Sequence, residues 1–535
     1  MKKSTIVTIF LFLSIYIIGL FAANDYGISW DENTHRIFGQ KTIVYIIKYF
    51  GFDHLITIPE GLNEFGSGGW AIKDYSTIFD GLSAVIEELY PIQDMRDIFL
   101  FRHVLNWTFY FFGFVGFFLL LNETIQSRFV VFISSFFYLL HPRLLGHGFF
   151  NLKDSVAQAF VAIALYYCLR YLRIRKFTNS IFSGLLLALC IVTRMATIYI
   201  PFLFLLFLVI DDNNSKGFYI IKNLKYHIIF LISIFIGIYV LHPFLWDDPI
   251  NSFISIIKEQ AKFPWSGNSF FLGEYIIAKN LPWYYIPTWI SITTPLPFLM
   301  LFALGSFVSF KKCFKLSDRQ TIIDKFMFLS FVIPVLSIII LQSTLYDGWR
   351  HMFFIYPFLA YFMAKGFAAA VEWFDGKLQI GKQFISILFG IFIFIGPLYS
   401  IINIHPFQQV YFNLFAGKDP MLNFEGDYWG TSFRQGLEWI IENDDRDSIL
   451  VVVNDPPGST NRHMIKSEER KRLHFKLRAN IDELTYQSGD YYMTNFRYQQ
   501  THGYPPDKQK FLVLANEVYA INTGGMKIIA IYKLN

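Results

Sequence analysis

The chain has 535 residues, of which 54% are hydrophobic and only 16% are charged. A soluble surface normally carries roughly a quarter of its residues as charged side chains, so most of this surface must face lipid. The composition excludes intrinsic disorder, a collagen-like structure and a fully soluble enzyme, and the net charge of +5 is too small to indicate a nucleic-acid partner.

The first residues are Met1, Lys2 and Lys3, followed by an uncharged apolar run over 4–23. A cleaved signal peptide has an apolar region of only about 7–15 residues, whereas about 20 residues cross the hydrocarbon core of a bilayer. We therefore predict an uncleaved first transmembrane helix with its N-terminus in the cytoplasm.

Further apolar runs predict additional spans, about eleven in all. They lie at 99–121, 128–141, 154–172, 180–196, 197–210, 226–243, 284–309, 326–344, 351–371 and 383–403. The stretch 180–210 admits one long helix or two short ones that meet near Arg194. Two helices keep the later Lys and Arg clusters on the cytoplasmic side, where membrane proteins collect them, so we predict two.

The sequence divides into a transmembrane domain over 1–403, with a long first outer loop at 24–98, and a small extracytoplasmic α/β domain over 404–535. The second part is much more polar. It shows helical periodicity at about 431–442 and strand patterns that are typical of a buried sheet. These predicted strands lie at 448–453, 511–514 and 527–532.

Ionisable residues at membrane depth usually mark a functional site, and here most of them cluster at the predicted outer ends of helices. The first cluster follows the first helix and contains the adjacent carboxylates Asp31 and Glu32. Such a pair can act as a general base, as metal ligands or, for Asp31, as a plain helix N-cap. The spacing alone leaves these interpretations open.

The second cluster occupies the short turn 141–155 between two apolar spans and includes Arg143, His147, Lys153 and Asp154. Asp154 could cap the following helix, and Lys153 could extend its ammonium group toward the membrane surface. Capping alone does not require so many ionisable residues in one turn.

The third cluster, Tyr346-Asp-Gly-Trp-Arg-His351, lies between the ninth and tenth spans. Arg350 could anchor a helix at the interface, but its forked guanidinium is also suited to binding two phosphate oxygens. No tight His, Asp and Glu spacing of the zinc type is present, so we predict no metal site. Asp31 and Glu32 could still help to hold a divalent cation.

Four ordered motifs resemble the membrane glycosyltransferases of the GT-C fold, and specifically the family 39-like group of protein O-mannosyltransferases and bacterial aminoarabinose transferases. They are Asp31-Glu32 within Ser29-Trp-Asp-Glu-Asn-Thr-His35, the stretch His141-Pro-Arg-Leu-Leu-Gly-His-Gly-Phe-Phe-Asn-Leu-Lys-Asp154, the cluster Tyr346-Asp-Gly-Trp-Arg-His351, and Asp427-Tyr-Trp-Gly430. They span nearly the whole chain in the family's order.

The resemblance implies that Asp31 is the general base and that the donor is a sugar on a polyprenyl phosphate. Of the other two expected catalytic residues, Glu32 supports Asp31 or hydrogen-bonds the sugar, and Asp154 orients Lys153 or the acceptor. The phosphate leaving group needs cationic stabilisation more than acid help. We assign this donor-phosphate binding to four residues: Lys153, Arg350, His351 and Arg143. We expect three further residues to bind substrate: His147, Asn151 and Asp347.

We therefore predict an inverting transferase that needs no cofactor and passes the sugar to a hydroxyl of a lipid, glycan or protein. The predicted location is the bacterial inner membrane, with the C-terminal domain outside the cytoplasm. The alternatives are a transporter or lipid flippase with an exported sensing domain, and a degenerate family member that binds a lipid glycan without transferring it.

Overall fold

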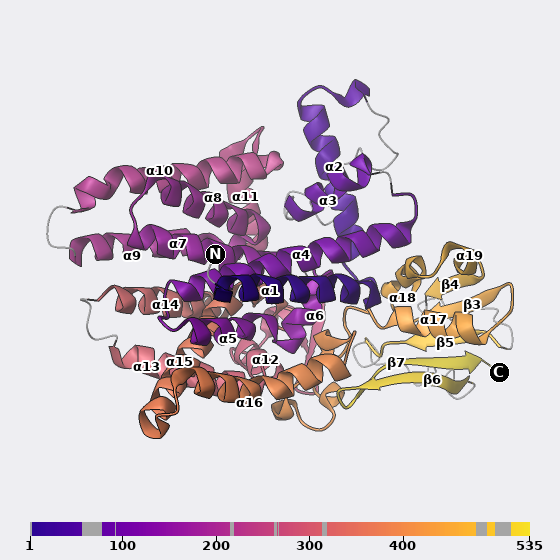
Figure 1. The fold of residues 1–535 in the computed structure, drawn as a ribbon. Helices are drawn as coiled ribbons and strands as arrows, with labels where there is room; N and C mark the ends of the chain where they lie inside the picture. The colour runs from indigo at the N-terminus through magenta and orange to yellow at the C-terminus, as the bar shows by residue number, and fades with distance from the viewer. Residues whose placement is uncertain are drawn as a thin grey trace.

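The computed structural model describes residues 3–55, 78–90, 92–214, 219–261, 265, 267–312, 318–477, 489–497 and 515–534. Figure 1 shows a bundle of long helices, with a small sheet and its helices packed at one end of the bundle. The predicted strand at 511–514 lies outside the described residues.

The helices of the bundle follow one another along the first three quarters of the chain. The first nine are α1 (Lys3–Ala22), α2 (Glu32–Tyr49), α3 (Ile78–Leu89), α4 (Met95–Asn122), α5 (Arg128–Leu139), α6 (Pro142–Phe150), α7 (Asp154–Arg173), α8 (Phe177–Thr193) and α9 (Tyr199–Asn214). The next seven are α10 (Tyr219–Leu241), α11 (Pro249–Ala261), α12 (Tyr285–Thr293), α13 (Leu296–Lys312), α14 (Arg319–Leu341), α15 (Tyr356–Leu378) and α16 (Lys382–Asn403).

The protein is a multi-pass membrane protein. In the described residues, eight helices are long and apolar enough to cross a bilayer, or up to ten if each of two bent pairs is one span. The expected count of about eleven is not confirmed, because α8 has only 17 residues and is shorter than a typical span. Large apolar side chains such as Phe10, Phe21 and Phe392 are exposed on α1 and α16, as lipid-facing residues should be.

The two bent helix pairs, α5 with α6 and α12 with α13, each have a proline at the bend. The chain turns by 64° between α5 and α6 and by 119° between α12 and α13. His141 and Thr294, which precede Pro142 and Pro295, have extended backbones with ψ of 110° and 132°. A residue before proline is disfavoured in the helical region because the proline ring crowds its backbone. The predicted spans 128–141 and 284–309 are therefore each interrupted.

Two helices form the stretch 180–210, as predicted. Helix α8 ends at Thr193, and Arg194 is extended with φ of −142° and ψ of 102°. A 3₁₀ turn, η4 (Met195–Ile198), then leads into α9.

The centre of the bundle is closely packed around α7 and α15, the most enclosed of the candidate spans. Helices α13 and α15 approach each other at two glycines. A Cβ atom on Gly305 would lie 1.8 Å from the carbonyl oxygen of Phe362, and one on Gly366 would lie 2.1 Å from that of Leu301. Only glycine permits this backbone contact. It fixes α15 and the 3₁₀ segment η7 (Arg350–Ile355) that precedes it.

The end of the chain forms an α/β layer. Its strands are β3 (Ile449–Val453), β4 (Leu473–Leu477), β5 (Tyr491–Thr494), β6 (Ala515–Thr523) and β7 (Met526–Leu534), and its helices are α17 (Phe433–Asn443), α18 (Pro456–Thr460) and α19 (Ser467–Arg470). The sheet order is β4-β3-β5-β7-β6. Strand β3 is parallel to both its neighbours, whereas β7 is antiparallel to β5 and β6.

The predicted helix at 431–442 and the strands at 448–453 and 527–532 correspond to α17, β3 and β7. Helix α17 packs on the sheet through Phe433 and Leu437, which join Val451 and Ile531 in one buried cluster. A two-stranded hairpin, β1 (Asn268–Phe271) and β2 (Glu274–Ile277), lies in the loop before α12 and was not predicted from the sequence.

Candidate active site

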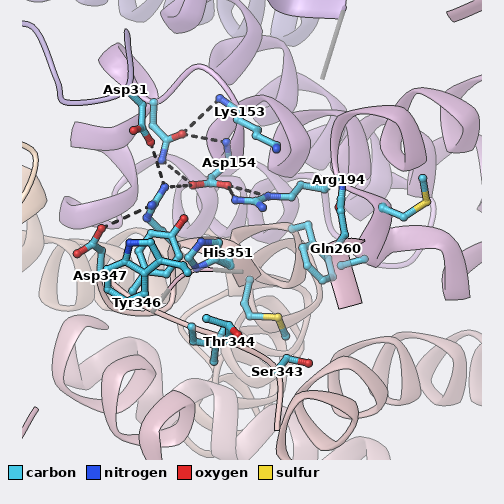
Figure 2. Close-up of a pocket in the computed structure, with 18 of the residues that line it drawn as sticks. Asp31, Lys153, Asp154, Arg194, Gln260, Ser343, Thr344, Tyr346, Asp347 and His351 are labelled. Carbon is cyan, nitrogen blue, oxygen red and sulfur yellow. Dashed lines mark hydrogen bonds and ion pairs between the residues drawn. The ribbon is translucent and has the colours of Figure 1, made fainter. Parts of the chain in front are cut away.

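A cavity of about 920 Å³ lies where the first turns of α2 and α7 meet η4, η7 and the end of α14. Eight of the ten predicted site residues line it: Asp31, Glu32, Asn151, Lys153, Asp154, Asp347, Arg350 and His351. Figure 2 shows Asp31, Lys153, Asp154 and Arg194 along one wall, with Tyr346, Asp347 and His351 below them. The three sequence clusters therefore meet at one cavity.

The adjacent carboxylates Asp31 and Glu32 have different environments. The Asp31 side chain is 37% exposed and lies 3.5 Å from Nη1 of Arg350. Although Asp31 occupies the N-cap position of α2, its side chain makes no capping hydrogen bond, which removes the plain N-cap interpretation. Glu32 is buried; it accepts a hydrogen bond from the Ser29 amide at 2.6 Å, and its other oxygen lies 2.9 Å from Nε2 of His103.

The segment before Asp31 is held by the C-terminal layer. A Cβ atom on Gly27 would lie 2.1 Å from the carbonyl oxygen of Thr431, so a larger residue would push the two segments apart. The amide of Trp30 donates to the carbonyl of Trp429 at 3.0 Å. The side chain of Asn461 both accepts from the Ile28 amide and donates to its carbonyl. These contacts fix the position of the Asp31 backbone.

A buried ion-pair network holds the following turn of α2. Arg102 of α4 donates to Asp80 and to Glu87 of α3, each at 3.0 Å. Asp80 lies 2.7 Å from Nδ1 of His35, and Glu87 accepts from Arg36 at 2.9 Å. The Arg102 side chain is fully buried. Helix α2 is therefore fixed to α3 and α4 by buried ion pairs.

Arg350 is the central cation of the cavity. Its guanidinium lies 3.5 Å from Asp31, 3.7 Å from Asp154 and 3.5 Å from Asp347. The rings of Tyr346 and Trp429 each lie 4.8 Å from its Cζ atom and hold it by cation–π contact. These ion pairs are longer than the 2.7–2.9 Å typical of a charge-assisted hydrogen bond, which leaves Arg350 room to bind an incoming anion.

Asp154, the first residue of α7, receives a second cation from Arg194. The Nε of Arg194 donates to Oδ1 of Asp154 at 2.8 Å, and its Nη2 also contacts that oxygen. The Asn151 amide nitrogen donates to Oδ2 at 3.1 Å, while its oxygen accepts from the Asp154 amide. Because α8 ends at Thr193 and Arg194 is extended, the Arg194 guanidinium lies next to Asp154.

Lys153 and His351 complete the polar wall. Burial and the nearby Arg194 guanidinium lower the pKa of Lys153 to about 7, because both favour the neutral amine. The Nδ1 atom of His351 is buried without a hydrogen-bond partner among the described residues. An unpaired buried nitrogen is costly, and a ligand bound in the cavity can satisfy it.

Arg497, a residue of the C-terminal layer, also lines the cavity. Its Nη2 atom donates to Asp347 at 3.2 Å, and its Cζ lies 5.0 Å from the Trp30 ring. Burial and the Asp347 carboxylate hold the pKa of Glu425 above its usual range, and burial raises the pKa of Asp455 to about 7. No local pattern in the sequence pointed to Arg497, which follows strand β5 and lies near Asp347 only in the folded chain.

Arg143 and His147 do not line the cavity. The guanidinium of Arg143 donates to the carbonyl of Tyr411 at 3.2 and 3.1 Å, and the Phe412 ring lies 4.6 Å from its Cζ. His147 is fully buried against Asn151 and Tyr428. The geometry therefore gives no support to the expected donor-phosphate role of Arg143 or the substrate role of His147.

The described residues contain no group of three or more His, Cys, Asp and Glu side chains placed to hold a metal ion. The cavity instead combines an exposed carboxylate with several cations on one wall. Such a site can accept a proton at Asp31 and bind a phosphate beside it.

Comparison of the sequence with protein-family models and with curated proteins finds no match. Solved structures that resemble the fold include ArnT from Cupriavidus metallidurans in the apo state, at a TM-score of 0.46 and 10% identity over 99% of this chain and 98% of that one. They also include the oligosaccharyltransferase AglB from Archaeoglobus fulgidus in complex with an inhibitory peptide and a dolichol-phosphate, at a TM-score of 0.47 and 10% identity over 86% of this chain.

The chain spans 64% of the length of AglB. ArnT and AglB are both glycosyltransferases of the GT-C fold, the group that the sequence motifs resemble.

Proposed function

We propose that this protein is an inverting glycosyltransferase that moves a sugar from a polyprenyl-phosphate carrier to an acceptor hydroxyl. The observation that carries the proposal is the position of Asp31, an exposed carboxylate without a capping bond that faces a cavity wall bearing Arg350, Lys153 and Arg194. A base beside a set of cations matches a reaction in which a hydroxyl loses a proton while a phosphate leaves.

In the proposed step, Asp31 takes the proton of the acceptor hydroxyl as the hydroxyl oxygen attacks the anomeric carbon. The bond between that carbon and the phosphate oxygen breaks, and the polyprenyl phosphate leaves with the bonding electrons. Arg350 and Lys153 stabilise the charge that develops on the phosphate. Attack from the face opposite the leaving group inverts the configuration at the anomeric carbon.

The remaining site residues act through these groups. Asp154 orients Arg194 and Arg350, Asn151 holds Asp154, and Asp347 holds Arg350 from the other side. Glu32 is already bonded to His103 and the Ser29 amide, which suits it to positioning Asp31 rather than to proton transfer. His351 offers its unpaired nitrogen to the sugar or the phosphate.

The long contact between Arg350 and Asp31 bears on the order of binding. The guanidinium lies 3.5 Å from the Asp31 carboxylate. A donor phosphate competes with the carboxylate for the same guanidinium. Binding of the donor therefore releases Asp31 from its ion pair and leaves it accessible to the acceptor hydroxyl.

We place the reaction at the outer face of a bacterial inner membrane, with the N-terminus in the cytoplasm. The clustering of Lys and Arg in the loops on the other side of the bundle supports this orientation. The acceptor is a hydroxyl of a lipid, a glycan or a protein.

The test is a transfer assay with the purified full chain in lipid nanodiscs, using labelled polyprenyl-phosphate sugars and a membrane extract as the acceptor source. We expect label to move into an acceptor with the wild type and not with Asp31→Asn, while both bind the donor. Transfer by Asp31→Asn at a near-normal rate would overturn the assignment of the base. A failure of the wild type to bind any donor would favour the transporter alternative.

A further inference from the structure

A second recess lies at the end of the bundle away from the cavity. It has a volume of about 620 Å³ and is formed by the end of α4, the last turn of α7 and the first turn of α14. Its lining residues are Glu123, Arg170, Arg173, Ile174, Arg319, Gln320 and Ile323. Three guanidiniums therefore surround one carboxylate in a concave site between helices.

The helices fix the depth of this recess in the membrane. Helix α7 has Asp154 at the cavity and Arg173 at the recess, and its 20 residues span about 30 Å at 1.5 Å per residue. Helix α14 starts at the recess with Arg319 and ends at Leu341, which lines the cavity. About 30 Å is the thickness of the hydrocarbon core, so the recess lies at the headgroup level of the opposite leaflet.

The arginines of the recess have unused binding capacity. Arg170 donates to the hydroxyl of Tyr166 and has no carboxylate within ion-pair distance among the described residues. Arg173 lies 3.3 Å from Glu123 with 40% of its side chain exposed. Arg319 pairs with Asp211 at 3.0 Å through one edge of its guanidinium and is 46% exposed. Each can donate further hydrogen bonds into the recess.

The net positive charge of the recess indicates that its ligand is an anion. Three arginines and one carboxylate, Glu123, line the recess. When Asp211, Asp212 and Arg175, which are ion-paired beside Arg319, are counted as well, the formal excess is one positive charge, which matches a phosphate group carrying one negative charge. Forked guanidiniums bind phosphate oxygens in pairs. Ile174, which is 41% exposed, adds an apolar edge. A ligand with a phosphate head and an apolar body satisfies both parts.

We propose that this recess binds the phosphate headgroup of an anionic membrane lipid in the leaflet opposite the cavity. The lipid joins α4, α7 and α14 at their ends, and α7 and α14 run from that point to the cavity. The proposal concerns lipid binding alone and does not depend on the transferase activity.

The proposal is tested with the full chain in phosphatidylcholine nanodiscs that contain a small fraction of labelled phosphatidylglycerol. The variant Arg170→Gln/Arg173→Gln should weaken binding of the labelled lipid about tenfold or more, because each guanidinium supplies charge-assisted hydrogen bonds. The matched control Arg128→Gln/Lys382→Gln removes two charges from exposed residues at the same end of the bundle. It should change binding less than about twofold.

Equal losses in both double variants would overturn the proposal, because diffuse surface charge would then explain the binding. A third variant, Ile174→Trp, keeps every charge but fills the recess, and it should also weaken binding. Normal binding by Ile174→Trp would contradict a lipid seated in the recess. A separate competition experiment adds millimolar inorganic phosphate to the wild-type protein with bound labelled lipid. Complete displacement of the lipid would show a site for a soluble anion and overturn the lipid assignment.

Discussion

Two ion-pair networks meet at the first turn of α2, and they differ in tightness. Where α2 meets α3 and α4, the ion pairs of the Arg102 network measure 2.7–3.0 Å, and Arg102, Asp80 and Glu87 are nearly fully buried. In the cavity, Arg350 lies 3.5–3.7 Å from three carboxylates. A closed network of buried pairs fixes a structure because breaking it leaves an unpaired charge. We call the Arg102 network the tight network and the Arg350 network the slack network. In the slack network one cation faces three carboxylates at long distances, so it can still bind a ligand.

The boundary between the two networks runs between Asp31 and Glu32. Glu32 belongs to the tight side through His103, whereas Asp31 faces the cavity. Adjacent residues of the same chemical type thus have separate tasks, one in holding α2 and one in the reaction.

The largest expected effect is on Asp31. We predict that Asp31→Asn lowers the transfer rate about 10²- to 10⁴-fold, the usual contribution of a general base, without lowering the melting temperature. Glu32→Gln should instead lower the melting temperature, because it weakens the bond to His103. Transfer rates and thermal melts of both variants, measured in the same detergent, check the prediction. A reversed pattern would mean that Glu32 is the base.

The next effect concerns the tight network. Arg102→Met should lower the free energy of unfolding by about 3–5 kcal/mol, because it leaves Asp80 and Glu87 buried without a cation. Arg128→Met, at an exposed position, should change it by less than about 0.5 kcal/mol. Denaturant unfolding monitored by tryptophan fluorescence measures both. If Arg102→Met kept full stability, the network would not be what holds α2.

A smaller effect is expected for the slack network. Arg350→Lys keeps the charge but loses the forked geometry, and we predict a fall in kcat/KM of about ten- to a hundredfold with little change in stability. Arg143→Lys removes the same geometry from a residue outside the cavity and should leave the KM for the donor unchanged. Steady-state kinetics with varied donor distinguish the two. A raised donor KM in Arg143→Lys would restore the phosphate role that the sequence predicted for it.

The smallest effect is a pH dependence. The pKa of Lys153 is lowered to about 7, so its ammonium charge is present below that pH and is lost as the pH rises through it. The donor phosphodiester keeps its charge over this range, and its affinity should fall up to about tenfold between pH 6 and 8.5. Lys153→Arg should bind donor equally across the range, because arginine stays protonated. The same slope in both proteins would remove Lys153 from the phosphate site.

Local sequence patterns were sufficient to predict the helical bundle and eight residues of the cavity. Charged residues are rare in this chain, so those at helix ends stood out, and Asp31, Asp154 and Arg350 indeed line one cavity. The strand patterns at 448–453 and 527–532 were equally clear, because continuous apolar residues identify a buried strand, and they correspond to β3 and β7.

The orientation of side chains within a motif could not be predicted. Arg143 and Lys153 share one motif, yet the bend of 64° before α6 directs Arg143 toward Tyr411 and away from the cavity. Arg497 was missed because its partners, Trp30 and Asp347, are distant in sequence. Such contacts arise from tertiary packing and leave no local pattern.

The break at Arg194 also bears on how the protein enters the membrane. Helix α8 is about 25 Å long, which is shorter than the hydrocarbon core, and it ends at a cation whose partner, Asp154, begins the preceding helix. Inserted alone, α8 would carry an unpaired guanidinium into lipid, at a cost of a few kcal/mol. Insertion of α7 and α8 as a pair avoids this cost, because Asp154 then pairs with Arg194.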